Sequence, residues 1–342
     1  MSSKEMVSVI VVNYNGAHLL PECLSSLTAQ DYPSLEILVV DNGSIDESEG
    51  VVHEHGCVFI SLGENCGLST AYNRGAEKAK GEYLFFVNND MRFEPNCIEH
   101  LVEALATNGD TFASDPLHYN WEGDDIIHFR TVLERIRSPR ELFSHLILPK
   151  PPLMRSYVPC TEVVAVPWGC AGSLMVDREM FWALGGWDEK FFLDMEDIDL
   201  CWRAWLRGWA TVFVPHAQLY HRWGASNDEQ LRRAKEPRIQ ARLERTDFRR
   251  LVSQQKNHLR FALKVLDVPS VAALIGIKFV GLPLFAVRRP IVARAFVWAL
   301  GRLVKELPEI RRLRQSIHRS AVCSSRDLIH RFILANPGRT SG

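Results

Sequence analysis

The first 110 residues alternate between short apolar runs and amphipathic stretches, and no other sequence feature constrains the fold as strongly. Apolar runs at residues 7–12, 35–40, 58–62 and 83–87 have the length and composition of strands that are buried on both faces. The stretches that follow the first three runs are helical, most clearly at residues 19–27, where apolar side chains recur at helical spacing. Strands that alternate with helices through short loops form a parallel, doubly wound sheet.

Polar residues follow these strands where each one ends. The carboxyl ends of parallel strands lie along one edge of the sheet, so we expect the four loops to meet at one cleft. Each residue alone also suits a turn or a helix cap, but their shared position favours a binding site. Oxygen ligands of this kind suit a nucleotide diphosphate and its divalent metal ion. The candidates are Tyr14, Asp41, Asn65, Asn73, Asn89 and Asp90.

Two familiar nucleotide-binding motifs are missing from the sequence. It contains neither a GxGxxG pattern nor a GxxxxGK[ST] pattern, which argues against a dinucleotide fold and a P-loop. The eight cysteines form no CxxC pair, which argues against a zinc site or a disulfide framework and favours a reducing cytosol. The N-terminus lacks an apolar stretch of signal-peptide length, so we expect the first strand to begin at once.

Charge divides the chain into two parts. Residues 1–230 carry 16 Lys and Arg against 34 Asp and Glu, whereas residues 231–342 carry 24 against 7. We therefore predict an acidic domain over residues 1–230 and a separate basic tail. The basic tail at 231–342 is expected to face an anionic partner.

Residues 111–165 show poor periodicity, and we expect loops and short helices there.

An acidic cluster lies at residues 194–199. Four acids at a helix start suit the helix dipole, which is the structural alternative. The chemical interpretation is that one carboxylate takes the proton of an attacking hydroxyl. His216 and His221 follow the last predicted strand; one of them could join Asp90 around a metal ion, because Mn²⁺ accepts nitrogen ligands.

Several segments together resemble family 2 glycosyltransferases of the GT-A fold. VSVIVVNYNG, ILVVDNGSIDES and NCGLSTAYNRGAEKAKGEYLFFVNND resemble the donor half, and GGWDEKFFLDMEDIDLCWRAWLRG resembles the acceptor motif. The resemblance covers about residues 7–230. It implies a catalytic domain over residues 1–230, with a nucleotide-sugar half at 1–110 and an acceptor half at 111–230. It implies an α/β fold with a Rossmann-like, mainly parallel sheet flanked by helices, followed here by a C-terminal helical appendage.

The resemblance also implies roles for individual residues. Tyr14 and Asp41 would hold the nucleotide base, and Asn89 and Asp90 would contact the diphosphate. Asn88 and Asn89 replace carboxylates, as in rhamnosyltransferase-type members, so Asp90 is the one charged group of this motif. The remaining nucleotide-pocket residues would be Asn65, Gly67 and Asn73.

The acid motif and the histidine complete the implied site. Asp197 would be the catalytic base, with Glu196 and Asp199 positioning the acceptor or the helix start. We expect burial under nearby aromatic residues to raise the pKa of Asp197. Asp90 and His221 would bind Mg²⁺ or Mn²⁺, and His216 would be structural.

These features predict an inverting, metal-dependent glycosyltransferase. The expected donor is dTDP-rhamnose or a UDP-sugar. The expected acceptor is a hydroxyl of a glycan. We expect this glycan to be linked to a polyprenyl diphosphate and to belong to cell-surface polysaccharide synthesis. A non-catalytic nucleotide-sugar-binding or scaffold protein is one alternative. A nucleotidyltransferase is another, although residues 13–16 are not the glycine-rich, basic loop that it would need.

The tail contains an apolar stretch of about one bilayer span at residues 268–287. Lys278, Gly276, Gly281 and Pro283 count against a spanning helix. Arginine-rich flanks favour interfacial helices on an anionic cytoplasmic leaflet, and a helical bundle with a solvated basic face is the alternative. No nucleic-acid-binding motif is present. We expect a cytoplasmic protein that is peripheral at the inner face of the cell membrane.

Overall fold

The computed structural model describes residues 5–128, 130–134, 154–222, 237–288 and 290–332. The chain divides into two compact units. The first unit comprises residues 1–131, 157–204 and 209–225, and the second comprises residues 132–156, 205–208 and 226–342. The predicted site residues all belong to the first unit.

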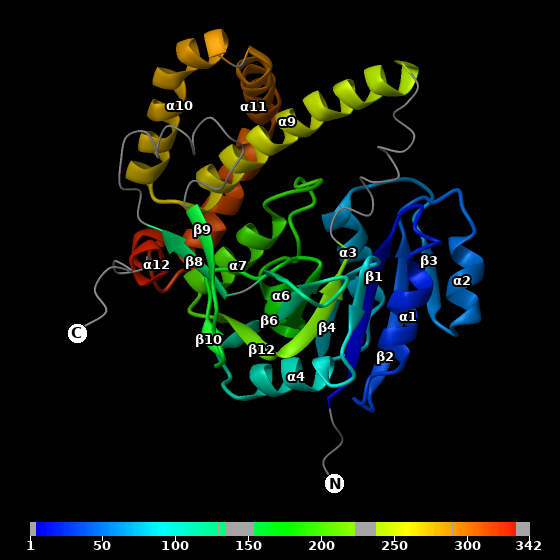
Figure 1. The fold of residues 1–342 in the computed structure, drawn as a ribbon. Helices are drawn as coiled ribbons and strands as arrows, with labels where there is room; N and C mark the ends of the chain where they lie inside the picture. The colour runs from blue at the N-terminus through cyan, green and yellow to red at the C-terminus, as the bar shows by residue number, and fades with distance from the viewer. Residues whose placement is uncertain (1–4, 129, 135–153, 223–236, 289, 333–342) are drawn as a thin grey trace. The chain divides into compact units, whose positions relative to one another are not determined.

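Four parallel strands form one half of the main sheet, in the order β3-β2-β1-β4 (Figure 1). In this register Asn13 lies opposite Asp41, so the ends of the two central strands are level. The parallel sheet predicted from the alternating pattern is therefore confirmed. Its strands and connecting helices are β1 (Val7–Asn13), α1 (Leu20–Thr28), β2 (Leu35–Asp41), α2 (Ser48–Glu54), β3 (Val58–Ser61), α3 (Leu68–Lys78) and β4 (Tyr83–Asn88).

The other half of the sheet is mixed. β11 (Ser173–Asp177) runs antiparallel to both β4 and β6 (Thr111–Asn120), and β12 (Ala210–His221) runs parallel to β6. β10 (Val164–Ala165) pairs antiparallel with β12. The short strands β5 (Met91–Phe93) and β7 (Ile126–His128) pair with β12 and β6 respectively, and β8 (Arg130–Glu134) pairs with β9 (Met154–Val158).

The expectation of loops and short helices over residues 111–165 is wrong for the residues that the structure describes, which are mainly strands, whereas residues 135–153 lie outside the described residues. β6 runs through the middle of the sheet, and its first eight residues are buried. Its sequence, TFASDPLHYN, is too polar to resemble a buried strand. The polar side chains are tolerated because partners are present in the interior: Ser114 Oγ, for example, donates to the carbonyl of Leu101 at 3.1 Å.

Helices cover both faces of the sheet. Val7, Val9 and Val11 of β1 pack in one core with apolar residues of α1 and α4 (Cys97–Ala106). On the opposite face, Gly75 of α3 lies so close to β1 that an added Cβ would be 2.3 Å from a side-chain methyl carbon of Ile10. Glycine therefore permits the close packing of α3 on the sheet. α6 (Arg178–Ala183) and α7 (Glu196–Leu206) follow β11 in the sequence.

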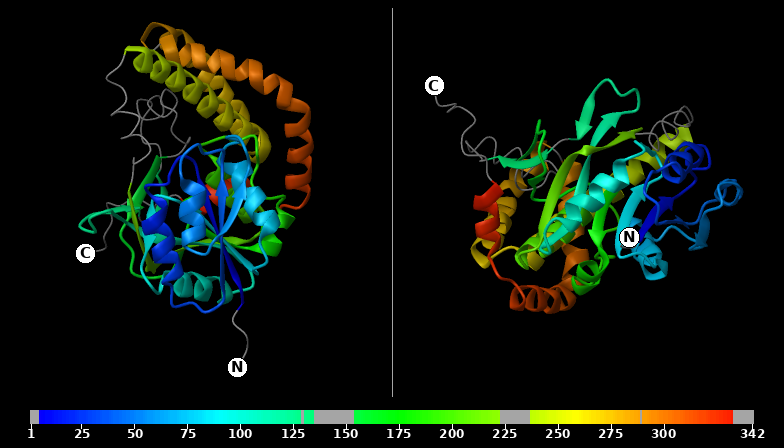
Figure 2. Two further views of the ribbon diagram at one scale, coloured as in Figure 1. Left: turned by 90° about the vertical axis from the view of Figure 1, so that its right-hand side faces the viewer. Right: turned by 90° about the horizontal axis from the view of Figure 1, so that it is seen from below.

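The second unit is mainly helical. Figure 2 shows its three long helices, coloured from yellow to orange, which are α9 (Pro237–Val265), α10 (Val268–Arg288) and α11 (Pro290–Arg319). α11 packs against both α9 and α10, and α12 (Ser325–Phe332) follows. Leu259, Phe296, Leu303 and Ile310 form a buried cluster between helices.

Buried charges also hold these helices together. The guanidinium of Arg260 is fully buried and lies 2.9 Å from Glu306 and 2.7 Å from Glu309. Lys278 is buried and donates to Gln255 at 2.8 Å, and desolvation lowers its pKa to about 8. Among the described residues, no helix is long and apolar enough to cross a bilayer.

Candidate active site

Asn13 connects the ends of the neighbouring strands β1 and β2. Its side-chain Nδ2 donates to Asp41 Oδ1 at 3.1 Å, and its Oδ1 accepts from Asn89 Nδ2 at 2.6 Å. Asp41 is 3% exposed, and its Oδ2 also accepts the backbone N–H of Ser44 at 2.9 Å. Sequence reasoning missed Asn13, because it reads as the last residue of a buried strand. The predicted base-stacking residue, Tyr14, is 51% exposed beside this network.

Hydrogen bonds of side chains and backbone fix the loop after β3. Asn65 Oδ1 accepts the N–H of Gly67 at 3.1 Å and the Nδ2 of Asn42 at 3.2 Å. Gly67 has φ of +87°, and an added Cβ would lie 2.7 Å from the ring of Phe192. The N–H of Leu68 donates to the carbonyl of Phe192 at 3.1 Å. The segment before the acid cluster is therefore attached to the loop that carries Asn65 and Gly67.

Asn73 makes a second connection between these two regions. Its Nδ2 donates to the carbonyl of Trp187 at 2.9 Å, and its Oδ1 accepts the N–H of Trp187 at 3.0 Å. Nδ2 also donates to Glu189 at 3.1 Å. With 5% of its surface exposed, Asn73 presents its amide to the protein backbone, an arrangement that sequence reasoning did not foresee.

Asp90 and His221 lie side by side. His221 Nε2 is 3.3 Å from Asp90 Oδ1, and both side chains are about nine-tenths buried. Antiparallel pairing of β12 with β5 places His221 opposite Met91, and the N–H of Arg222 donates to the carbonyl of Asp90 at 2.9 Å. The pairing of the two strands thus brings together two residues that are distant in sequence.

The chemistry of this pair suits a divalent cation. Asp90 Oδ1 is buried and has no hydrogen-bond donor among the described residues, and a buried carboxylate oxygen without a donor is costly. A carboxylate oxygen and an imidazole nitrogen are together acceptable ligands for Mn²⁺. Asn89 offers an amide that is already bonded to Asn13.

The acid cluster begins α7. Asp194 and Met195 have φ of +70° and +79°, an unfavourable conformation for residues other than glycine that often occurs at functional sites. Asp197 is half-buried, and its Oδ1 accepts the N–H of Ile198 at 2.8 Å. Asp199 is fully buried and pairs with Arg203, with 2.8 Å between carboxylate and guanidinium.

Glu196 is more deeply buried than Asp197, the residue for which the sequence led us to expect burial. Glu196 is 6% exposed, and its Oε2 has no hydrogen-bond partner among the described residues. Desolvation raises the pKa of Glu196 well above its ordinary value, and the neighbouring charge of Asp197 adds to the shift. Of the aromatic residues expected to cover the cluster, Trp187 and Phe191 are buried, whereas Phe192 is 51% exposed.

Tyr72 of α3 lies between the two acidic motifs. Its hydroxyl donates to Asn88 Oδ1 at 3.0 Å. Burial raises the pKa of Tyr72 well above its ordinary value, and the charges of Cys170, Glu196 and Asp90 add to it. Glu196 and Asp90 therefore both lie near enough to Tyr72 to influence the pKa of its hydroxyl. No sequence pattern indicated the contact of Tyr72 with Asn88, since Tyr72 occupies an ordinary apolar position of its helix.

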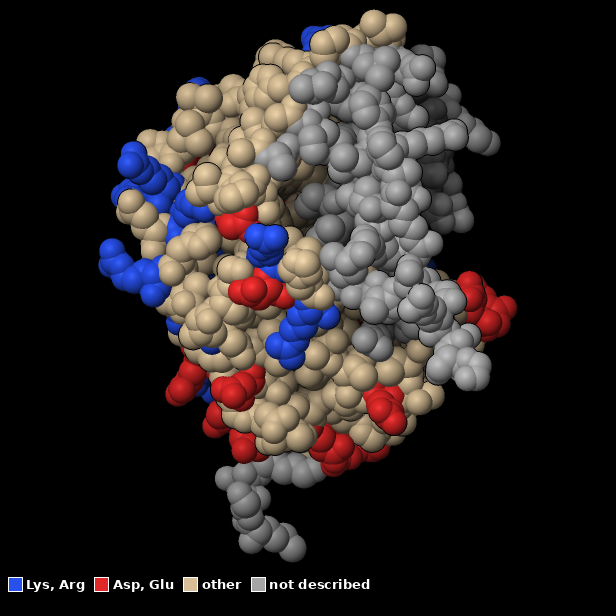
Figure 3. Space-filling model, turned by 90° about the vertical axis from the view of Figure 1, so that its left-hand side faces the viewer, with Lys and Arg blue, Asp and Glu red and all other residues tan. Residues whose placement is uncertain are grey.

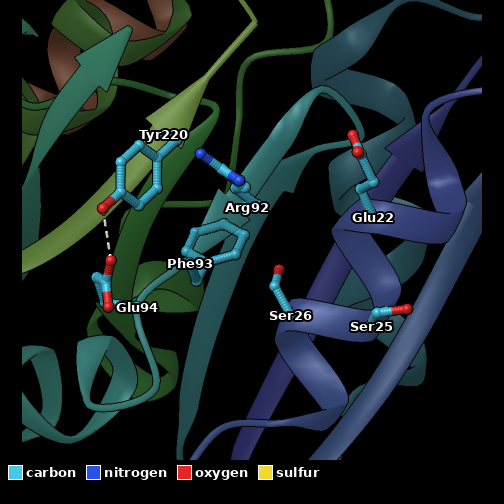
Figure 4. A pocket seen from close by; sticks show the side chains of 7 residues that line it. All are labelled: Glu22, Ser25, Ser26, Arg92, Phe93, Glu94 and Tyr220. Carbon is cyan, nitrogen blue, oxygen red and sulfur yellow. Dashed lines mark hydrogen bonds between the residues drawn. The ribbon is translucent and has the colours of Figure 1, made fainter. Parts of the chain in front are cut away.

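A surface cavity of about 490 Å³ lies on another side of the same strands (Figure 4). Arg92 and Tyr220 line it, and the Tyr220 hydroxyl donates to Glu94 at 2.6 Å. Glu22 of α1 forms part of the wall. Successive residues of a strand point to opposite faces, so Tyr220 faces this cavity while His221 faces Asp90. We therefore distinguish the cavity from the site at the strand ends.

Known proteins resemble this chain in sequence. Residues 8–171 match the family described as Glycosyl transferase family 2. An N-acetylglucosaminyl-diphospho-decaprenol L-rhamnosyltransferase of Mycobacterium tuberculosis is 27% identical over 235 residues, which are 64% of this chain and 76% of that protein. An uncharacterized glycosyltransferase of Rickettsia typhi is 39% identical over 103 residues, which are 29% of this chain and 32% of that protein.

Several solved structures resemble this chain in fold. GalNAc-T7 with UDP, GalNAc and Mn²⁺ matches with a TM-score of 0.58 at 19% identity, over 90% of this chain and 58% of that chain. S. aureus TarS 1–349 in complex with UDP-GlcNAc matches with a TM-score of 0.53 at 16% identity, over 92% and 87% of the two chains. At these identities the likeness shows the GT-A-type fold.

The strand order, the site at the strand ends and the sequence matches agree with one another. The mixed sheet with helices on both faces is of the GT-A type. The relatives are named as glycosyltransferases, and one of them is a rhamnosyltransferase. Residues 8–171 match Glycosyl transferase family 2, and together with the named relatives this match shows that the chain is a glycosyltransferase.

Proposed function

We propose that the chain transfers a sugar, with inversion, from a nucleotide sugar to a hydroxyl of a glycan acceptor. The observation that carries this proposal is the contact of His221 with Asp90, 3.3 Å apart at the end of β4. The two side chains offer a nitrogen and a carboxylate oxygen beside the strand ends where a parallel sheet binds its ligand. The acidic start of α7 belongs to the same site through Tyr72.

The nucleotide sugar binds along the ends of β1 to β4 in this proposal. Tyr14 stacks on the base, an interaction supported by its half-exposed ring. Asp41 accepts from the base or the ribose, in addition to its bonds to Asn13 and Ser44. The contacts of Asn73 with Trp187 support a positioning role for it. The remaining residues assigned to this pocket are Asn65, Gly67, Asn89 and Asp90.

Asp90 and His221 hold Mg²⁺ or Mn²⁺ on the diphosphate. The cation, when bound, offsets the negative charge that develops on the leaving nucleotide. The buried Asp90 oxygen without a donor supports this assignment. One carboxylate and one imidazole favour Mn²⁺, since Mg²⁺ prefers oxygen ligands.

Asp197 is the catalytic base in this proposal. It removes the proton of the acceptor hydroxyl as the oxygen attacks the anomeric carbon. Its partial exposure supports contact with an acceptor. Glu196, whose burial favours the protonated form, and Asp199, which is held by Arg203, fix the start of α7 around it.

We assign dTDP-rhamnose as the first candidate donor and a UDP-sugar as the second. The likeness to the mycobacterial rhamnosyltransferase supports the first assignment. The name of that relative also supports an acceptor sugar on a polyprenyl diphosphate. Such an acceptor would place the enzyme in cell-surface polysaccharide synthesis.

We further propose that the second unit binds the anionic inner face of the cell membrane from the cytoplasm. Figure 3 shows one face of the molecule, on which many Lys and Arg side chains are exposed and several of them lie beside Asp and Glu. α11 exposes both apolar and basic side chains, a combination suited to an anionic lipid surface. We call these residues the α11 outer face: Ile291, Val297, Trp298, Val304 and Leu307 with Arg294, Arg302, Lys305, Arg311 and Arg312.

A screen of nucleotide sugars with Mn²⁺ tests the catalytic proposal. Thermal shift identifies the donor that stabilises the protein, because a ligand that binds the folded state raises its melting temperature. The donor found is then tested for transfer to a synthetic polyprenyl-diphosphate sugar. We expect dTDP-rhamnose to stabilise the protein and to be consumed only when acceptor is present. Stabilisation by no nucleotide sugar would refute the proposal.

A further inference from the structure

A second group of metal-binding side chains lies in the interior of the first unit. Asp115 and His118 come from β6, and His128 comes from the adjacent strand β7, where it pairs with His118. One ligand atom of each residue lies within 4.8 Å of the others. Asp115 and His118 are fully buried, and His128 is 5% exposed. Neither the sequence motifs nor the proposed transfer reaction uses these residues.

Their present contacts leave ligand capacity unused. Asp115 Oδ2 is 2.7 Å from His128 Nε2, and His118 Nε2 is 2.8 Å from the hydroxyl of Ser173. His118 Nδ1 is buried without a hydrogen-bond partner among the described residues. An unsatisfied polar atom in the interior is costly. The two imidazole rings are 4.6 Å apart between centroids, which is close enough for both to bind one ion.

The environment favours the neutral imidazole that a metal ion requires. Desolvation lowers the pKa of His118 well below its ordinary value, and the charges of His128 and His221 add to the effect. Asp115 is oriented from outside the group, because its Oδ1 accepts the N–H of Cys170 at 2.8 Å. Hydrogen bonds of this kind commonly fix the ligands of a metal ion.

We propose that Asp115, His118 and His128 bind a structural Zn²⁺ ion. Two imidazoles and a carboxylate form a ligand set that zinc accepts, and a water molecule or the Ser173 hydroxyl could supply a fourth ligand. Binding through His128 Nε2 would replace its hydrogen bond to Asp115, with the neutral ring carrying its proton on Nδ1. The site differs from that of Asp90 and His221, which uses a different carboxylate and a different imidazole.

Such an ion would strengthen a wall of the active site. Asp115 already supports the loop that contains Gly169 and Cys170, and an added Cβ on Gly169 would be 2.7 Å from the Asp115 side chain. The same loop leads to Gly172, whose carbonyl accepts the N–H of Asn88 at 2.9 Å. Zinc bound at Asp115 would therefore stiffen the backbone next to the strand-end motif.

Metal analysis of the purified protein tests this proposal. The protein is dialysed against a chelator, incubated with ZnCl₂, freed of loose metal by gel filtration and analysed for zinc. The Asp90→Asn variant serves as the background, because it weakens the other proposed site. We expect one equivalent of retained zinc in that background. Failure of the Asp90→Asn protein to retain zinc would overturn the proposal, whatever the behaviour of further variants.

Variants then locate the bound ion. In the same background, His118→Gln and His128→Gln should each lose the retained equivalent, whereas His53→Gln should keep it, since His53 is exposed on α2. Circular dichroism verifies that each variant folds. Co²⁺ as a probe should give a visible absorption band in the parent that is lost in both variants. Full zinc retention by folded His118→Gln and His128→Gln would overturn the assignment.

Discussion

His221 Nε2 lies 3.3 Å from Asp90 Oδ1, and β-pairing fixes this distance. His221 is opposite Met91, and the backbone of Arg222 is bonded to that of Asp90. The side chains therefore meet without any long flexible connection. Asp90 follows two asparagines rather than acids, and β12 places a second possible metal ligand, His221, beside it. In the proposed function, this arrangement gives a motif with a single carboxylate a second ligand for the divalent cation.

We predict that Asp90→Asn and His221→Gln each reduce transfer by about 10²-fold or more, the scale of removing one group that stabilises the charged transition state. Each variant should also need a higher Mn²⁺ concentration for half-maximal rate. Initial rates measured over a Mn²⁺ titration give both quantities. His216→Gln is the matched control, because His216 is exposed on the same strand. Equal metal dependence in His221→Gln and the control would contradict the assignment.

We predict that Asp197→Asn reduces transfer by about 10²- to 10⁴-fold, the usual contribution of a general base. The amide keeps the size of the side chain but cannot take a proton from the acceptor. Nucleotide-sugar affinity, measured by calorimetry, should be unchanged. Glu54→Gln on the exposed end of α2 is the control for loss of a carboxylate. Near-normal turnover by Asp197→Asn would show that another group is the base.

The buried carboxyl of Glu196 should make stability depend on pH. Its pKa is raised in the folded protein, so the folded state keeps a proton over a range in which the unfolded state has lost it. Stability is therefore expected to fall as pH rises from the ordinary glutamate value through the raised one. Glu196→Gln has no proton to lose and should flatten this decline.

Thermal denaturation of the wild type and Glu196→Gln at several pH values measures the effect. The variant should gain stability relative to the wild type as the pH rises. Glu54→Gln again provides the comparison, because the exposed carboxylate should change little. Parallel stability curves for the wild type and Glu196→Gln would mean that Glu196 is not protonated in the folded state.

Asn73→Ala should destabilise the protein, because it leaves the N–H and carbonyl of buried Trp187 without their side-chain partners. Two unsatisfied groups of this kind cost on the order of 2 to 4 kcal/mol. Urea denaturation measures this loss. Asn96→Ala is the control, because Asn96 begins α4 without a side-chain capping bond, and it should stay within about 0.5 kcal/mol of wild type. Equal midpoints for both variants would contradict the predicted role.

The parallel half of the sheet could be predicted because its strands are continuous in apolar character. In β1 every residue is buried, and the pattern VSVIVVN contains two polar side chains, Ser8 and Asn13. β6 could not be predicted in this way. Asp115 and His118 lie in its buried part, and their acceptability depends on His128 and Ser173, which come from other segments. A tertiary partner of this kind leaves no periodic signal in the strand itself.

Ligand chemistry alone predicted one contact of the candidate site, that of Asp90 with His221. A lone carboxylate at Asp90 required a second ligand, and His221 is in place to be that ligand. The contact of Asn73 with Trp187 was not predictable, because helix periodicity says nothing about which distant backbone a buried amide will meet. The same holds for Glu196, since position within an acidic cluster does not reveal which carboxyl is buried.

The α11 outer face should bind vesicles that contain anionic lipid. Arg302→Gln with Lys305→Gln removes two exposed cations, each worth about 1 kcal/mol near such a surface, so binding should weaken roughly 30-fold. Trp298→Glu should weaken it further, because the ring is 55% exposed. Val58→Glu, at an exposed position of β3, is the control. Flotation with and without anionic lipid measures binding, and salt-insensitive or absent flotation of the wild type would favour a solvated helical bundle.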